Sequence, residues 1–97
     1  MEANQGSEKK VTESALEKEA KAIAESQGWI YLSTDDSRGF KSLTFYPTGG
    51  SLLSRLFINL NDEGVIEWKA YGREDNEPRD RGVDLNEIPL TKYYLCK

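Results

Sequence analysis

The spacing of apolar residues changes once along this chain, and the change limits the folds that the chain can adopt. Before Gly28, apolar residues recur at intervals of three and four, which is the spacing of one helix face, at Leu16, Ala20, Ile23 and Ala24. After Gly28, apolar and polar residues alternate, as they do in strands with one buried face. The sequence therefore predicts an α+β fold in which one N-terminal amphipathic helix packs on an antiparallel sheet of about 4–5 strands.

The helix has two competing start signals and one stop signal. A hydrophobic staple would place the N-cap at Thr12, whereas a capping box would place it at Ser14, with Glu17 three residues later. Gly28 lies where a left-handed residue commonly ends a helix. The apolar face consists mostly of alanine, so the helix needs a sheet to pack against.

Period-two segments separated by turn residues predict the strands of the sheet, in the order helix, four strands, loop and final strand. The expected strands are Trp29–Ser33, Phe40–Tyr46, Leu52–Leu60, Val65–Tyr71 and Leu90–Cys96.

The segment 52–71 has the strongest hairpin signal, because Asn61–Gly64 ends in a glycine where a left-handed residue belongs. Alternation in its second strand places Ile66, Trp68 and Ala70 on one face. The same alternation places Val65, Glu67, Lys69 and Tyr71 on the other.

The length of 97 residues fits one domain. Residues 1–10 are polar and lack periodicity, so we expect a flexible tail followed by a single domain over residues 11–97. Within this domain, residues 73–88 are rich in acids and poor in apolar residues. They predict a long exposed acidic loop, in which any helical turn would lie near Asp84–Glu87.

The residue inventory disfavours catalysis and metal binding. The chain has no histidine and one cysteine, Cys96, so it lacks Ser–His and Cys–His nucleophile pairs and the ligands of a zinc or iron–sulfur site. Loosely spaced acids near Asp35 and near Asp75 lack the regular ligand spacing of a calcium loop. We therefore expect no catalytic residues, no metal and no cofactor, and predict that the protein is not an enzyme.

Charge and hydropathy restrict partners and location. The net charge is −4 and the isoelectric point is about 4.8, so general nucleic-acid binding is disfavoured and a partner with a basic surface fits better. No apolar run of about 18 residues occurs, which predicts no membrane span. The N-terminus has no apolar segment typical of a secretory signal, so the expected location is cytoplasmic.

A single helix covers only one face of a sheet, so aromatic residues should remain on the other face. The expected set is Phe57 with Tyr71, joined by Tyr93 or Tyr94, and Arg55 and Lys69 lie beside them in the strands. Such residues dominate protein interfaces. Ordinary cross-strand pairing on a solvated sheet explains the same pattern without a binding role.

These patterns lead to the hypothesis of a non-catalytic protein-binding module, a small acidic regulator or inhibitor. It would act through the exposed aromatic sheet face and the acidic loop, with the binding residues Arg55, Phe57, Lys69, Tyr71, Glu74, Asp75, Glu77, Asp80 and Tyr93.

Two alternatives belong to other functional classes. One is single-stranded nucleic-acid binding by base stacking on the same aromatic residues. The other is a self-associating structural subunit that uses an exposed edge strand, Phe40–Tyr46 or Leu90–Cys96. The expected state in solution is a monomer or a weak homodimer.

Overall fold

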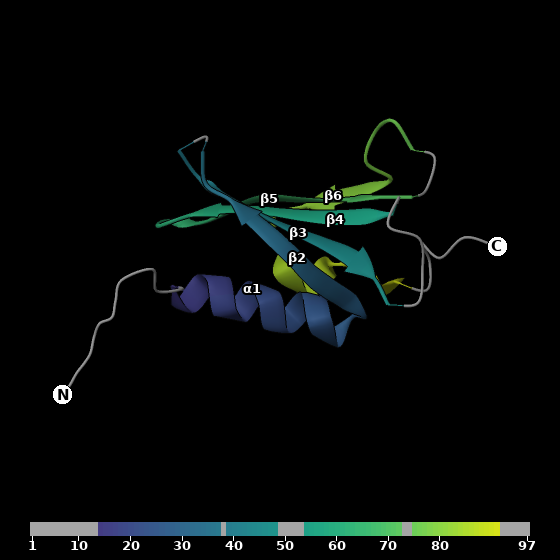
Figure 1. Cartoon of the computed structure of the whole chain (residues 1–97), viewed down its shortest axis with the longest axis horizontal. Helices are drawn as coiled ribbons and strands as arrows, with labels where there is room; N and C mark the ends of the chain where they lie inside the picture. Colours follow the sequence, from purple (N-terminus) through teal and green to yellow (C-terminus); the bar gives the residue numbers. More distant parts are fainter. Residues whose placement is uncertain (1–13, 38, 49–53, 73–74, 92–97) are drawn as a thin grey trace.

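The computed structural model describes residues 14–37, 39–48, 54–72 and 75–91. One helix precedes a five-stranded antiparallel sheet with the order β2-β3-β4-β5-β6, which confirms the predicted α+β class (Figure 1). The elements are α1 (Ala15–Ser26), β2 (Trp29–Asp35), β3 (Lys41–Pro47), β4 (Arg55–Asn61), β5 (Gly64–Tyr71), β6 (Asp80–Gly82) and the short 3-10 helix η1 (Leu85–Glu87).

The helix α1 begins with the capping box. The backbone N–H of Glu17 donates to Ser14 Oγ at 3.1 Å, and the backbone N–H of Ser14 donates to Glu17 Oε1 at 3.0 Å. The alternative cap at Thr12 lies outside the described residues. The helix ends before Gly28, whose φ of 96° confirms the predicted stop. No helix in the described part of the chain is long and apolar enough to cross a membrane.

The core lies between the sheet and a layer made of α1 and the segment around η1 (Figure 1). Ala20 and Ala24 are fully buried, so the helix contacts the sheet through its smallest side chains. Leu85 and Ile88 join the same apolar cluster, as do the buried strand residues Trp29, Leu43, Phe45, Leu56, Ile58, Leu60, Trp68 and Ala70.

The register of β4 and β5 corrects the prediction for two residues. Leu60 pairs with Val65 and Asn59 pairs with Glu67, so Ile66 is an extra residue in a β-bulge. A bulge reverses the alternation on one side of it. Consequently Val65 packs against the core, whereas Ile66 is 42% exposed, the reverse of the expected arrangement.

The acidic loop is more structured than its composition indicated. Residues Asp80–Gly82 pair with β5 as a fifth strand, and η1 supplies the helical turn expected near Asp84. A Cβ atom at Gly82 would lie 3.0 Å from Trp68 Cζ2, so glycine allows β6 to approach the indole ring. Loop composition does not reveal this contact, because the partner lies on another strand.

The predicted final strand Leu90–Cys96 is not seen where the chain is described. Leu90 and Thr91 are not in a strand, and residues 92–96 lie outside the described residues. The backbone N–H of Thr91 instead donates to Gln27 O at 2.9 Å. This bond ties the segment to the end of α1.

The strand order also corrects one predicted surface for self-association. The strand β3, which contains most of Phe40–Tyr46, lies between β2 and β4 and is not an edge. In the described part of the chain, the edge strands are β2 and the short β6. A register shift between Tyr31 and Ser33 makes Leu32 an extra residue in β2, and such bulges hinder edge-to-edge pairing.

Candidate functional site

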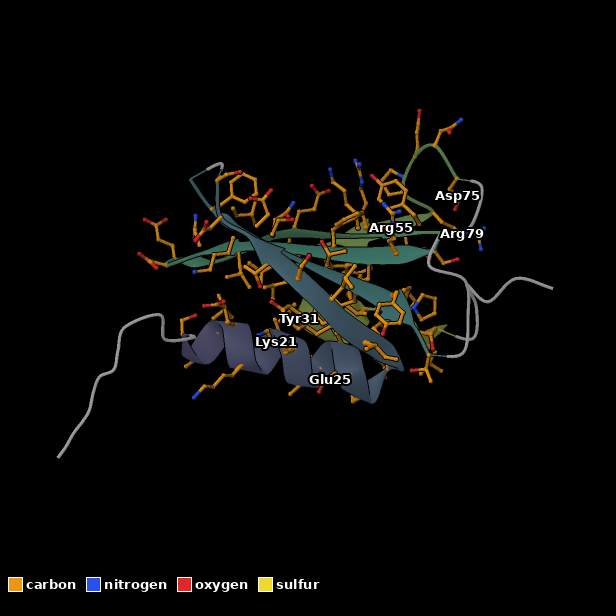
Figure 2. The ribbon with its side chains drawn as sticks, viewed as in Figure 1. Lys21, Glu25, Tyr31, Arg55, Asp75 and Arg79 are labelled. Atoms are coloured by element: carbon orange, nitrogen blue, oxygen red, sulfur yellow. The ribbon has the colours of Figure 1, made fainter. Side chains whose placement is uncertain are left out.

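Four of the predicted binding residues lie together on the sheet face opposite α1. Arg55 pairs with Tyr71 and Phe57 pairs with Lys69 across β4 and β5. Their neighbours Leu56 and Ala70 are fully buried on the core side, so these four side chains point away from the core. Figure 2 shows Arg55 on the side of the sheet away from α1.

The expected aromatic pair is present. The ring centroids of Phe57 and Tyr71 are 5.7 Å apart and the ring planes meet at 83°, an edge-to-face contact. Such pairs contribute about 0.5–1.5 kcal/mol beyond the area that they bury. Both residues are half-buried. The contact therefore fixes the orientation of each ring while leaving part of it exposed to solvent.

Basic side chains from β5 and β6 meet around one carboxylate on this face. Lys69 Nζ lies 3.9 Å from Glu67 Oε1, and Arg81 Nε lies 3.3 Å from Glu67 Oε2. Exposed ion pairs of this kind contribute about 0–1 kcal/mol, so they orient Lys69 more than they stabilise the fold. Arg81 was missed as a site residue because β6 was not expected.

A groove of about 190 Å³ crosses β3, β4 and β5 on the same face. Its lining residues are Ser42, Phe57, Asn59, Lys69 and Tyr71. Small-molecule sites commonly occupy about 300–1,000 Å³, so this groove has the size of a single side chain. Ser42 and Asn59 were missed because polar residues on a solvated strand carry no signal, and only the register brings them together.

Asn59 gives the groove an unusual polar feature. Its Oδ1 is buried and has no hydrogen-bond partner within the described residues. An unsatisfied buried acceptor costs about 1–3 kcal/mol. Most buried polar groups in proteins are paired, so this oxygen marks a place where the isolated chain leaves an interaction unmade.

The loop residues of the predicted set do not extend the groove. Asp75 Oδ2 accepts the backbone N–H of Gly72 at 2.7 Å and lies 3.1 Å from Arg79 Nε. The Gly72 N–H lowers the pKa of Asp75, and the nearby Arg79 guanidinium lowers it further. Asp75 therefore braces the chain between β5 and β6.

The other loop residues are separated from the groove or lie outside the described residues. Glu77 is exposed. Asp80 pairs with Ala70, whose side chain faces the core, so it does not share the face of Lys69. Glu74 and Tyr93 lie outside the described residues.

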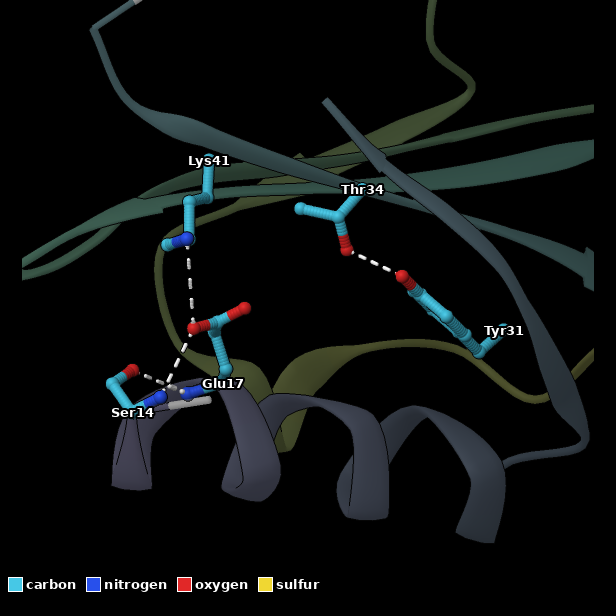
Figure 3. A network of polar contacts seen from close by, with 5 residues as sticks. All are labelled: Ser14, Glu17, Tyr31, Thr34 and Lys41. Atoms are coloured by element: carbon cyan, nitrogen blue, oxygen red, sulfur yellow. Dashed lines mark hydrogen bonds and ion pairs between the residues drawn. The ribbon is translucent and has the colours of Figure 1, made fainter. Parts of the chain in front are cut away.

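A larger hollow of about 430 Å³ lies at the start of α1 and has a different character. Its lining includes Glu17, Lys41, Asp36 and Asp62. Glu17 Oε1 accepts the backbone N–H of Ser14 and lies 3.9 Å from Lys41 Nζ (Figure 3). Glu17 is the buried acid among the described residues that line the hollow, and it already has a structural role as part of the helix cap.

No cluster of three or more potential metal ligands of the types His, Cys, Asp and Glu occurs in the ranges that the structure describes. No protein-family model matches the chain, and no match is found among curated proteins or among solved structures.

Proposed function

We propose that this protein is a non-catalytic protein-binding module, a small regulator or inhibitor, that acts through the sheet face opposite α1. We call this surface the groove face and define it as Arg55, Phe57, Asn59, Lys69 and Tyr71. The observation that carries the proposal is the buried, unpartnered Oδ1 of Asn59 in a groove of side-chain size. A partner that inserts a hydrogen-bond donor there satisfies an acceptor that the isolated chain leaves unsatisfied.

The aromatic and basic residues of the groove face support binding to protein. Aromatic residues and arginine are enriched at interface hot spots, which lie in well-packed pockets. The edge-to-face contact holds Phe57 and Tyr71 in place before binding, so little side-chain entropy remains to be lost. These features favour an anchor site for one side chain of a partner.

The chemistry of the groove favours binding over catalysis. Among the described residues, its lining contains no carboxylate, thiol or imidazole to serve as a general base for the Ser42 hydroxyl, and the Lys69 amine lies beside the Glu67 carboxylate. The larger hollow contains carboxylates, but Glu17 is engaged in the capping box.

The ion pairs on this face favour a protein partner over single-stranded nucleic acid. Nucleic-acid binding depends on basic side chains that replace the counterions of phosphates. Lys69 and Arg81 already flank the carboxylate of Glu67, which offsets part of their charge. The phosphates of a nucleic acid would be repelled by that carboxylate, or would have to displace it from Lys69 and Arg81.

Affinity capture from the cells that naturally make this chain tests the proposal. The baits are the full chain, a Phe57→Ala/Tyr71→Ala double variant, and a Lys18→Ala control on the exposed side of α1. We expect a partner that the full chain and the control retain and the double variant loses. Calorimetry with the purified partner should then show direct binding to the full chain. If the double variant binds the same partner with unchanged affinity, the groove face is not the binding site.

A further inference from the structure

We infer that the groove binds a primary carboxamide, the side chain of an asparagine or glutamine of the partner protein. This inference rests on the proposed function and specifies the group that enters the groove. It follows from three properties of the residues that line the groove: the unsatisfied amide oxygen of Asn59, the cationic donor of Lys69, and two aromatic rings of fixed orientation.

The unsatisfied oxygen of the Asn59 amide requires a hydrogen-bond donor. Asn59 is half-buried as a residue and lines the groove, while its Oδ1 is covered and unpaired among the described residues. The terminal torsion of an asparagine is broad, so a small rotation turns the amide toward an incoming group. Rotation by half a turn exchanges the oxygen and the nitrogen, and a carboxamide pairs with either orientation because it contains both a donor and an acceptor.

Charge decides against the ionised alternatives. A carboxylate would pair with Lys69 but would bring only acceptor oxygens to the unsatisfied oxygen of Asn59. An ammonium or guanidinium group would satisfy Asn59 but would meet a charge cluster in which two cations, Lys69 and Arg81, outnumber the single carboxylate of Glu67. Each ionised group is therefore opposed by one side of the groove, whereas a neutral carboxamide can donate to Asn59 and accept from Lys69.

The walls favour a side chain with a short apolar stem. Phe57 and Tyr71 flank the groove with rings held nearly perpendicular at 83°. The methylene groups of glutamine or asparagine can pack against such rings while the amide pairs with Asn59. A serine or threonine hydroxyl also donates and accepts, but it makes both bonds through one atom, whereas a carboxamide divides them between its nitrogen and its oxygen.

Four capped tripeptides, acetyl-Gly-X-Gly-N-methylamide with X as glutamine, glutamate, lysine or norleucine, test the inference; the N-methylamide cap leaves the glutamine side chain as the single primary carboxamide. All four share the same backbone amides, so differences report the side chain alone. They are titrated into the isotope-labelled full chain while nuclear magnetic resonance follows the Asn59 side-chain amide and the rings of Phe57 and Tyr71. We expect the glutamine peptide to shift these signals and to bind about 3- to 10-fold more tightly than the other three, the effect of one or two net hydrogen bonds.

The variant Asn59→Leu provides the matched control, since leucine has a similar size and no polar atoms. It should lose the preference for glutamine and bind the glutamine and norleucine peptides equally. Asn59→Ala, which cannot overpack the groove, should give the same result. The inference is overturned if the glutamate or lysine peptide binds as tightly as the glutamine peptide, if the groove signals do not shift, or if Asn59→Leu and Asn59→Ala keep the preference.

The same variants separate this inference from the proposed function. A captured partner that requires Phe57 and Tyr71 but binds Asn59→Leu normally would uphold the binding module and refute the carboxamide. A partner whose binding is unaffected by the Phe57→Ala/Tyr71→Ala change would refute the groove face itself.

Discussion

The indole Nε1 of Trp68 donates a 2.9 Å hydrogen bond to the backbone oxygen of Asp84. Trp68 belongs to β5 and Asp84 follows β6, so the bond holds the part of the acidic loop just after β6 against the core. The short strand β6 thereby gains a tertiary anchor that its own three residues do not supply.

We predict that Trp68→Phe loosens β6 selectively. The change removes the donor to Asp84 and part of a buried ring, and should lower the free energy of unfolding by about 1–3 kcal/mol. Trp29→Phe is the matched control, because Trp29 Nε1 donates a bond of the same 2.9 Å length to Pro89 O. Hydrogen exchange should accelerate at residues 80–82 in Trp68→Phe and not in Trp29→Phe. Equal acceleration in both variants would contradict the proposed anchor.

We predict that Gly28→Ala is more destabilising than Gly39→Ala. Both glycines have positive φ, 96° and 86°, so both substitutions introduce backbone strain of about 1–2 kcal/mol. A Cβ at Gly28 would also collide with the Thr91 side chain, whereas a Cβ at Gly39 would meet nothing within 4 Å. Urea denaturation measures the difference, and Thr91→Ala should reduce it when combined with Gly28→Ala. Equal losses for the two glycine variants would show that the Thr91 contact is unimportant.

We predict that Asp75 stabilises the fold in a pH-dependent way. Its pKa is lowered in the folded state, chiefly by the Gly72 N–H and also by Arg79, so its contribution is fully present above the ordinary value of 3.8. This contribution is lost as pH falls below that value through the lowered pKa. Asp75→Asn should therefore be less stable than the parent at pH 7, and the gap should narrow in acid. Glu77→Gln, an exposed neighbour, serves as the control for loop charge in thermal unfolding.

We predict that Ser14→Ala destabilises the chain by about 0.5–2 kcal/mol, because it removes the side-chain acceptor for the Glu17 N–H. Ser26→Ala is the comparison at the other end of α1. Its hydroxyl bonds an exposed helix carbonyl, Ile23 O, which water can satisfy instead, so its loss should be smaller. Circular dichroism during denaturation measures both. If Ser26→Ala proved the more damaging change, the capping box would not be the main stabiliser of the helix end.

The elements that follow from short-range pattern were predictable, whereas those that depend on distant contacts were not. The helix was predictable because Ser14, Glu17 and Gly28 are local signals. The alternation of β4 and most of β5 placed Phe57 and Tyr71 on one face. The bulge at Ile66 was not predictable, because one extra residue reverses the faces without changing composition.

The candidate site divides in the same way. Four of its residues, Arg55, Phe57, Lys69 and Tyr71, were predictable, because strand alternation places them on the face away from the core. Asn59 and Ser42 were not, because their role depends on strand register and on the burial of one oxygen atom. Arg81 required knowledge that an acidic, glycine-containing segment pairs with β5 through Gly82 and Trp68.

The strand order has a consequence for how the chain folds. Every strand pairs with the next one in sequence, so the sheet can grow by successive short loop closures, the kind of topology associated with rapid folding. Packing α1 and the segment around η1 onto the sheet is a separate step, which depends on contacts of long sequence separation. It joins Gln27 to Ile88 and Trp29 to Pro89 across 61 and 60 positions of sequence. We therefore expect the sheet to form early. The bonds from Gln27 and Trp29 to Ile88 and Pro89 should form late, because they join residues far apart in sequence.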